Sequence, residues 1–154
     1  MFLLLVVSFA LSTPVLEAQP LEFFNMAEFT DREPPYEVKM DSAFLLKLDE
    51  LRRLCDFPFH INSGYRSPKH SVEKYKAKPG THNKGIAVDI AVANDYQMNL
   101  ILRHALALGF TGIGIYPRHI HIDTRETKRV IWVGNFYTSN QARDSPNGKT
   151  KNAN

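Results

Sequence analysis

The chain is poor in the residues on which several common protein classes depend. Only one of its 154 residues is a cysteine, Cys55. A single cysteine forms no internal disulfide, and it excludes a zinc site built from several cysteines. Beyond residues 1–11 no stretch is long and apolar enough to cross a membrane, so a span within the body of the protein is not expected. The sequence also has no internal repeat, which excludes solenoid folds.

No lysine or arginine occurs in residues 1–11, which form an almost continuous apolar run at the start of the sequence. Such a run, followed by a small residue such as Ala18 at a plausible cleavage point, is typical of a secretory signal peptide and is short for a membrane span. Only the α-amino group supplies positive charge ahead of the run, so an uncleaved, membrane-tethering signal is the alternative. We expect residues 1–18 to be a signal peptide and the protein to be secreted or periplasmic and cell-wall associated.

The rest of the chain has the length and composition of one globular domain. Apolar residues make up 44% of the sequence, which is ordinary for a globular protein. We expect an irregular segment at 19–39, one folded domain at 40–137 and a disordered tail at 138–154, which has almost nothing to bury. Loss of residues 1–18 removes Glu17 and changes the net charge from +3 to about +4. This mild basicity suits an anionic surface such as a cell wall, although it is common elsewhere.

Hydrophobic periodicity predicts two helices and several strands. Apolar residues at helical spacing predict a helix over 40–54, which would bury Cys55 at its end, and a second helix over 94–108. Residues 64–84 have little periodicity and predict a long loop, which in a compact domain is usually functional or mobile. Alternating or β-branched runs predict strands over 59–62, 86–92, 110–116, 119–124 and 129–133. This order predicts an α+β single domain with two main helices and a central, mostly antiparallel sheet.

Three polar side chains alternate along the predicted strand at 119–124. His119, His121 and Asp123 are two residues apart, so they share one face of the strand. Such a row on an otherwise apolar strand is expected where the face meets a polar cleft or solvent. His121, in mid-strand, is the best ligand for a metal, and His119 would then lie beside the metal. A His-x-His pair on a solvent-facing strand is also common, so the pattern alone leaves both interpretations open.

A second group of candidate ligands lies around the predicted strand at 86–92. His82 comes just before this strand and Asp89 lies within it. An unpaired buried carboxylate costs several kcal/mol, so Asp89 needs a cation, either a metal or Arg66 in a plain salt bridge. A turn at Gly85, where no Cβ obstructs the backbone, would let the chain pass close to a metal and let His82 and Asp89 converge. Imidazole and carboxylate are ligands that zinc prefers.

The candidate residues also carry a resemblance to a known family. The segment Gly80–Asp89 resembles the Ser-x-His-x-x-Gly-x-Ala-x-Asp signature of the zinc D-alanyl-D-alanine metallopeptidases. That family includes D,D-carboxypeptidases, D,D-dipeptidases and phage endolysins that cut peptidoglycan stem peptides. Ser63–His70 is similar to the family's segment upstream of the signature. Gly112–Tyr116 and His121–Asp123 are similar to its closing strand pair.

The resemblance covers about residues 40–125 and implies a fold like that of the D,D-peptidases and hedgehog domains. It implies one Zn²⁺, because His82, Asp89 and His121 match the three zinc ligands of the family. It also matches Arg66 to the arginine that binds the substrate or the transition state.

Two positions depart from the family pattern. Gly80 stands where the signature has Ser, although Thr81 next to it offers a hydroxyl. Arg118 stands three residues before the last matched histidine, where many members place a glutamate as general base. Related lysostaphin-type peptidases use a His-x-His pair whose first member is catalytic, and His119-Ile120-His121 is similar to it. The signalling domain of hedgehog proteins has a similar zinc-binding core, also with His-x-His, and is not known as a peptidase.

We therefore expect an exported zinc metallopeptidase that hydrolyses an amide bond in peptidoglycan stem peptides or cross-links, with residues 40–137 as its zinc peptidase domain. Arg66 would hold the developing oxyanion and His119 would transfer the proton. Asp123 would orient a histidine or compete for the role of base. The sequence does not decide between a carboxypeptidase and an endopeptidase.

Two alternatives differ in class: a hedgehog-like zinc-binding module without peptidase activity, and a cell-wall-binding protein without a metal. As partners we expect a peptidoglycan peptide as substrate, no nucleic acid, no stable membrane span after signal cleavage, and no second subunit, that is, a monomer.

Overall fold

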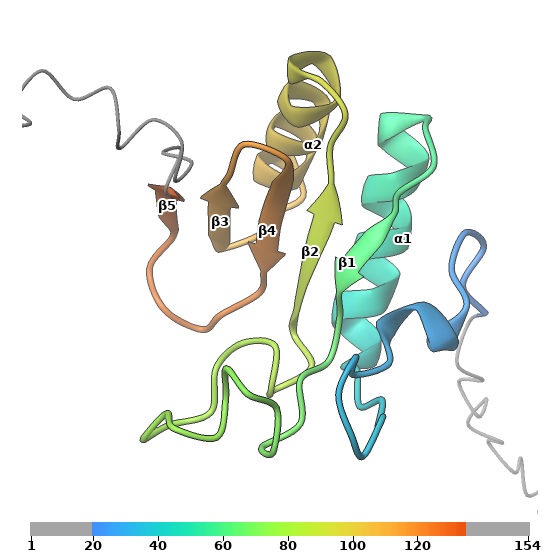
Figure 1. Ribbon diagram of the computed structural model, residues 1–154. Helices are drawn as coiled ribbons and strands as arrows, with labels where there is room; N and C mark the ends of the chain where they lie inside the picture. The colour runs from blue at the N-terminus through green and yellow to red at the C-terminus, as the bar shows by residue number, and fades with distance from the viewer. Residues whose placement is uncertain (1–19, 135–154) are drawn as a thin grey trace, which may run out of the picture.

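Five strands form one sheet at the centre of the computed structural model, which describes residues 20–134 (Figure 1). The strands follow one another across the sheet in the order β1-β2-β4-β3-β5. Their bounds are β1 Ile61–Ser63, β2 Ala87–Ala91, β3 Gly112–Ile115, β4 His119–Asp123 and β5 Val130–Val133. Three of the four pairings are antiparallel, and β5 pairs with β3 in parallel. The predicted α+β domain with a mostly antiparallel sheet is confirmed.

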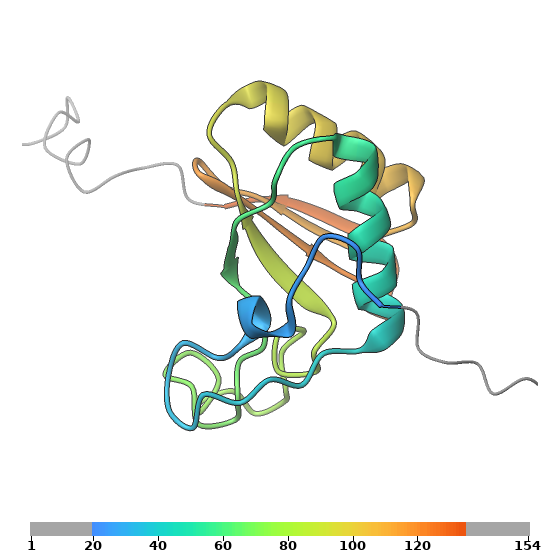
Figure 2. The same cartoon turned by 90° about the vertical axis from the view of Figure 1, so that its right-hand side faces the viewer.

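Two helices cover one face of the sheet. They are α1 (Ser42–Cys55) and α2 (Asp95–Ala107), close to the predicted ranges. Asp41 caps α1 by accepting the N–H of Phe44 at 2.8 Å, and Asn94 caps α2 by accepting the N–H of Gln97 at 2.9 Å. These side chains satisfy backbone donors that have no partner within the helix. Both helices lie on the same side of the sheet, and within residues 20–134 no helix covers the other side (Figure 2).

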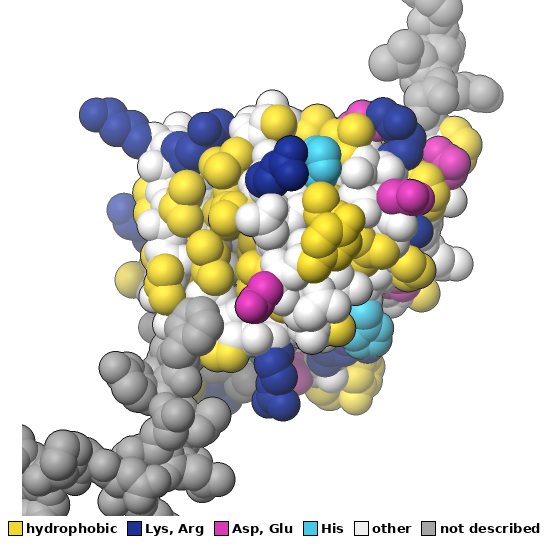
Figure 3. All heavy atoms as spheres, turned by 90° about the horizontal axis from the view of Figure 1, so that it is seen from above, with side chains coloured by type: hydrophobic (Ala, Val, Ile, Leu, Met, Phe, Trp, Pro, Cys, Tyr) yellow, Lys and Arg dark blue, Asp and Glu magenta, His cyan; other side chains and the backbone are white. Residues whose placement is uncertain are grey.

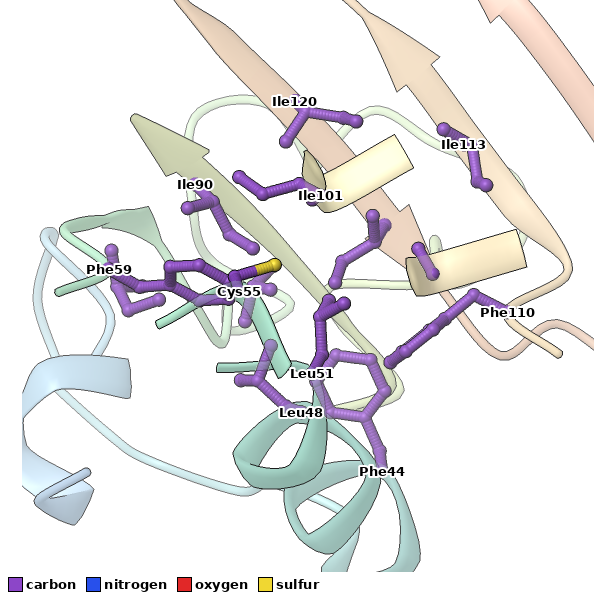
Figure 4. Packing of buried hydrophobic residues seen from close by; sticks show 14 of the residues in the cluster. Phe44, Leu48, Leu51, Cys55, Phe59, Ile90, Ile101, Phe110, Ile113 and Ile120 are labelled. Atoms are coloured by element: carbon purple, nitrogen blue, oxygen red, sulfur yellow. The ribbon is translucent and has the colours of Figure 1, made fainter. Parts of the chain in front are cut away.

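The hydrophobic core fills the space between the helices and the sheet (Figure 4). Phe44 of α1 meets Phe110 edge-to-face, with ring centroids 6.0 Å apart. Cys55 also lies in this core, where burial raises the pKa of its thiol to about 11, so the thiol is inert at neutral pH. The largest fully buried side chains of the core are Phe29, Phe44, Leu48, Leu51, Ile90, Ile101, Phe110, Ile113, Ile120 and Ile122.

One end of the protein carries exposed side chains of several kinds. Figure 3 shows the end of the protein that is uppermost in Figure 1, where hydrophobic, basic and acidic side chains lie beside one another. Across residues 20–134 neither helix is long and apolar enough to span a bilayer. The predicted signal peptide at 1–18 and the predicted tail at 138–154 lie outside the described residues.

The N-terminal segment lies beside α1 and next to the long loop of residues 64–86 (Figures 1 and 2). Within its described residues it contains one short 3-10 helix, Met26–Phe29, and is otherwise irregular. Phe29 is fully buried. Gly85 makes the predicted turn with φ +72°, but its close neighbours are the backbones of Lys39 and Met40. Gly85 therefore lets the chain pass the entry to α1, and the expectation that it makes room for a metal was wrong.

Candidate metal centre

The face of the sheet opposite α1 and α2 carries a row of candidate site residues. Asp89 of β2 pairs with His121 of β4, His121 pairs with Gly114 of β3, and Gly114 pairs with Trp132 of β5. Directly paired residues project from the same face of a sheet. Ile120 and Ile122, which alternate with the polar residues of β4, are fully buried in the core. The predicted shared face of His119, His121 and Asp123 is therefore present.

Three candidate ligand atoms from distant parts of the chain converge on one point. His82 Nε2 lies 3.1 Å from His121 Nδ1, and His121 Nδ1 lies 3.0 Å from Asp89 Oδ1. His82 Nε2 and Asp89 Oδ1 are 3.3 Å apart. All three residues are buried, and they form the one group of three or more His, Cys, Asp or Glu able to hold a metal within residues 20–134. The structure thus brings together the three residues that the sequence singled out.

The protons of the two imidazoles lie on the far sides of the rings. His82 Nδ1 is 2.7 Å from the carbonyl oxygen of Gly64, which only accepts, so we assign the proton to Nδ1. His121 Nε2 is 2.9 Å from Asp123 Oδ2, and we assign its proton there. In the neutral rings, His82 Nε2 and His121 Nδ1 then present lone pairs to each other and to Asp89. Three acceptors that face one another without a donor between them could hold a cation.

The spacing of these atoms fits zinc. Tetrahedral zinc with imidazole and carboxylate ligands at about 2.0–2.2 Å requires ligand atoms about 3.3–3.6 Å from one another. Of the observed separations, 3.3 Å lies at the lower limit of this range, and 3.0 and 3.1 Å lie a few tenths of an ångström below it. Two nitrogens and one oxygen also match the donor set that catalytic zinc sites use. A small outward adjustment of side chains would therefore seat the ion.

Arg66 occupies the second oxygen of Asp89. Its Nη2 donates to Asp89 Oδ2 at 2.5 Å and its Nε donates to the hydroxyl of Ser63 at 2.8 Å. The salt bridge considered as an alternative to a metal is therefore present, yet it leaves Asp89 Oδ1 facing the histidines. Burial raises the pKa of Asp89, but contacts with His121 and His82 outweigh it and hold the pKa well below its usual range. Asp89 is thus a carboxylate with Arg66 at one oxygen and the two imidazoles facing the other.

Asp123 lies beneath His121 and away from the open cleft. It is fully buried, and Arg125 grips it through Nε at 2.9 Å and Nη2 at 2.5 Å. Burial raises the pKa of Asp123, but hydrogen bonds from Arg125 and His121 keep it far below its usual range. A permanently charged, enclosed carboxylate is a poor general base and a good partner for a ring N–H. The geometry favours the orienting role of Asp123 over that of base.

We expect Asp123→Asn to lower zinc affinity by about 10–100-fold, because His121 would lose the carboxylate that fixes its tautomer. Competition with a chromogenic chelator measures this affinity. Asp49→Asn, at a carboxylate on α1 outside the metal centre, is the matched control and should bind zinc like the wild type. Equal zinc affinity in the Asp123 variant would show that the carboxylate does not support His121.

Two glycines open the floor of the site. A Cβ at Gly112 would collide with the carboxylate of Asp123, and a Cβ at Gly114 would come within 2.6 Å of Cε2 of Trp132. Both glycines lie in β3 two residues apart, so they leave space on the same face. The indole of Trp132 uses this space to approach His121, with ring centroids 5.3 Å apart. The strand Gly-Ile-Gly-Ile thus makes room in the cleft because its two glycines lack Cβ atoms.

Gly114→Ala is expected to push the indole of Trp132 away from His121 and to destabilise the fold by about 1–3 kcal/mol, as overpacking does. Trp132 is the one tryptophan of the chain, so its emission spectrum reports the displacement directly. Gly109→Ala is the control, because its added Cβ meets nothing within 4 Å although its φ of +79° strains the backbone. The control should lose stability and keep the emission maximum. An unchanged spectrum in Gly114→Ala would contradict the packing described here.

His119 stands beside the three converging residues and outside their cluster. Its ring stacks on Tyr116, with centroids 4.3 Å apart and planes inclined by 10°. Trp132 Nε1 donates to the hydroxyl of Tyr116 at 3.1 Å, which braces this pair from β5. Burial lowers the pKa of His119, so its imidazole is neutral and able to accept a proton. Arg118, at the position where many similar enzymes have a glutamate, is exposed and does not line the cleft.

The sequence did not single out Tyr116 and Trp132. Tyr116 follows the glycine-rich strand directly, which is a weak local signal. Trp132 belongs to a strand whose other residues are exposed, and its place beside His121 depends on the parallel register between β3 and β5. Such a register is set by tertiary contacts and has no local signature.

An open cleft of about 730 Å³ lies over this constellation. Among the described residues that line it, basic side chains predominate and Asp89 is the only carboxylate. Besides His82, Asp89 and His121, the cleft is lined by Arg66, Lys76, Thr81, His119, Arg125 and Trp132. Its chemistry suits a ligand that carries negative charge and a polar group able to reach the metal centre.

The chain was compared with models of protein families and with curated proteins. Residues 23–123 match the family model described as Peptidase M15, which covers more than half of the chain. The matched range contains His82, Asp89 and His121 as well as Arg66. No curated protein matches the chain.

Proposed function

The chain belongs to the peptidase M15 family of zinc peptidases, and on that premise we propose that it is an exported enzyme that hydrolyses an amide bond in peptidoglycan stem peptides or cross-links. The observation that carries the proposal is the convergence of three lone pairs from His82, Asp89 and His121 on one point. Export rests on the apolar run of residues 1–11 and is part of the proposal.

His82, Asp89 and His121 would hold one zinc ion, each through the atom that faces the other two. When bound, zinc would lower the pKa of a water molecule toward neutrality and polarise the carbonyl oxygen of the substrate. Gly64 and Asp123 fix the two imidazoles by accepting their outer N–H groups. This arrangement keeps both rings in the tautomer that a metal requires.

Arg66 supplies fixed positive charge to the cleft. Ser63 and Asp89 hold two of its five N–H donors, so the guanidinium is oriented before substrate arrives. We assign to it the stabilisation of the carbonyl oxygen as that oxygen gains negative charge. Because the charge is already in place, no reorganisation is needed during the reaction.

His119 is our candidate for moving the proton. It lines the cleft next to the three ligands, and its stacking on Tyr116 fixes the plane of the ring. In this role it would take a proton from the attacking water and give one to the leaving amine. Asp123 supports this assignment indirectly, because its enclosure by Arg125 removes the competing base.

The basic cleft is compatible with peptides that carry free carboxylates, as peptidoglycan stem peptides do. It is open enough for either a chain terminus or an internal segment of peptide, so both a carboxypeptidase and an endopeptidase remain within the proposal. A hedgehog-like zinc module without peptidase activity is the second candidate. It is favoured because Arg118 stands where many family members have a glutamate as general base.

Digestion of purified peptidoglycan, with the fragments read by mass spectrometry, tests the function. The proposal predicts released D-alanine or separated cross-links, loss of both with a chelator, and their return when zinc is restored. Protein that holds one zinc per chain and releases no fragment would overturn the peptidase and support the zinc module.

A further inference from the structure

We propose that Asp31, in the irregular N-terminal segment, is a positioning residue for Arg66, and that this segment forms part of the active-site scaffold. The inference rests on the proposed function, because Arg66 is assigned there to the developing oxyanion. It gives a role to a residue that neither contacts the three converging ligands nor lines the cleft.

Asp31 is a buried carboxylate with a long-range partner. It is 1% exposed, and its Oδ2 accepts the backbone N–H of Ser67, the residue after Arg66, at 2.7 Å. Its Oδ1 accepts the N–H of Glu33 at 3.1 Å. Burial raises the pKa of Asp31, but the N–H groups of Ser67 and Glu33 outweigh it and lower the pKa, so the group stays charged. Burying a charge costs free energy unless the charge is well hydrogen-bonded. A buried carboxylate is therefore unusual at a position that only holds a surface loop.

The same segment also holds the residues before Arg66. Phe29 accepts the N–H of Tyr65 at 2.9 Å through its carbonyl oxygen. Gly64 lies so close that an added Cβ would be 2.6 Å from the Cα of Phe29. The N-terminal segment therefore packs directly against the backbone on both sides of Arg66.

The opposite side of Arg66 is held by the turn that carries His82. The N–H of Arg66 is 3.4 Å from the carbonyl oxygen of His82, and the side chain of Asn83 donates to the carbonyl of Arg66 at 2.9 Å. The backbone of Arg66 thus lies between the metal-centre turn and the N-terminal segment. Asp31 bonds at the residue next to Arg66, where a shift would turn the guanidinium away from Asp89.

Other charged groups near Asp31 hold a different part of the loop. His70 Nε2 lies 3.7 Å from Asp31 and 3.6 Å from Glu33. Glu33 accepts the N–H of Ser71 at 2.7 Å. These contacts secure residues further along the loop, so among them Asp31 is the group that acts next to Arg66.

Asp31→Asn tests the proposal, with Asp49→Asn as matched control. Asp49 also tethers the N-terminal segment, by accepting the N–H groups of Glu22 and Phe23 at 2.9 and 3.0 Å, but it does not bond to the segment around Arg66. We expect Asp31→Asn to lower kcat by about 10–100-fold, as small misplacements of a catalytic group do, and to speed hydrogen exchange at the amide of Ser67. Zinc affinity should change less than twofold, since the metal ligands are untouched. Asp49→Asn should leave kcat, zinc affinity and the Ser67 amide as in the wild type.

A double-mutant cycle separates positioning from general stability. If Asp31 acts through Arg66, Asp31→Asn should lower kcat in the wild type and have little further effect in an Arg66→Ala background. Equal losses in both backgrounds, or a loss of zinc affinity in step with kcat, would overturn the proposal. Unchanged kcat and unchanged exchange at Ser67 would overturn it as well. If Asp31→Asn does not fold, Asp31→Ser, whose hydroxyl still accepts one N–H, replaces it.

Failure of the proposed function is recognised separately. If the wild type cleaves no peptidoglycan fragment, a crystal structure of zinc-loaded Asp31→Asn still decides the inference. Arg66 displaced from Asp89 supports the positioning role, and an unmoved Arg66 contradicts it.

Discussion

His121→Ala is expected to abolish both zinc binding and peptide hydrolysis. The substitution removes one of three ligand atoms that lie 3.0–3.3 Å apart. It also leaves Asp123 buried without the N–H that it accepts from His121. The loss of zinc affinity should exceed the roughly 10–100-fold that follows loss of a mere hydrogen-bond partner of a ligand. Elemental analysis after dialysis, giving zinc per protein chain, measures it.

His104→Ala provides the control for this variant. His104 lies in α2, on the opposite side of the sheet from the metal centre, so its loss should leave one zinc per chain and full activity. Stoichiometric zinc in His121→Ala would show that another residue completes the site. Loss of zinc in both variants would show that the change in His121→Ala is not specific.

His119→Ala is expected to lose turnover and keep its zinc. A positioned acid or base contributes about 10²–10⁴-fold to the rate, and His119 lines the cleft without joining the ligand cluster. Comparison of kcat and zinc content in the same preparation measures both properties. The combination distinguishes an enzyme from a zinc-binding module, because a module has no turnover to lose.

Two outcomes would contradict the role of His119. Full activity in His119→Ala would mean that the proton moves by another route. Loss of zinc together with activity would mean that His119 supports the metal centre itself, and Tyr116 would then stack on a structural residue.

Much of the fold could be predicted because it follows from local patterns. Leu48 and Leu51 recur at helical spacing in α1, and alternation along β4 separates Ile120 and Ile122 from His119 and His121. The sequence also indicates a site at Asp89, because a carboxylate in an apolar strand requires a cationic partner. The structure gives it two kinds of partner at once, since Arg66 takes one oxygen and the histidines face the other.

The parts that could not be predicted depend on contacts between distant segments. Asp31 lies in a segment without periodicity, and its partner Ser67 is 36 residues away. Trp132 reaches the site only because β5 pairs in parallel with β3 and because Gly114 lacks a Cβ. Gly85 illustrates the same limit, because the turn at this residue was foreseen while its actual neighbour, Lys39, was not. Local sequence predicts the backbone conformation of a segment, whereas tertiary packing determines which residues that segment contacts.

Several contacts on the face of the sheet opposite the helices hold the side chains of the cleft in place. The glycines of β3 leave space for the side chains of Asp123 and Trp132. Asp123 and Gly64 fix the tautomers of the two histidines by accepting their N–H groups. Trp132 donates to the hydroxyl of Tyr116 at the edge of the cleft. Each feature restrains a side chain of the cleft before any ligand binds. Preorganisation of this kind is what a catalytic metal site requires.

Zinc-edge X-ray absorption spectroscopy of the purified protein with one equivalent of zinc tests the central claim most directly. Our account predicts two imidazole nitrogens and a carboxylate oxygen at about 2.0–2.2 Å from the metal. A first shell with fewer than two imidazoles, or one containing sulfur at about 2.3 Å, would show that His82, Asp89 and His121 do not hold the ion together.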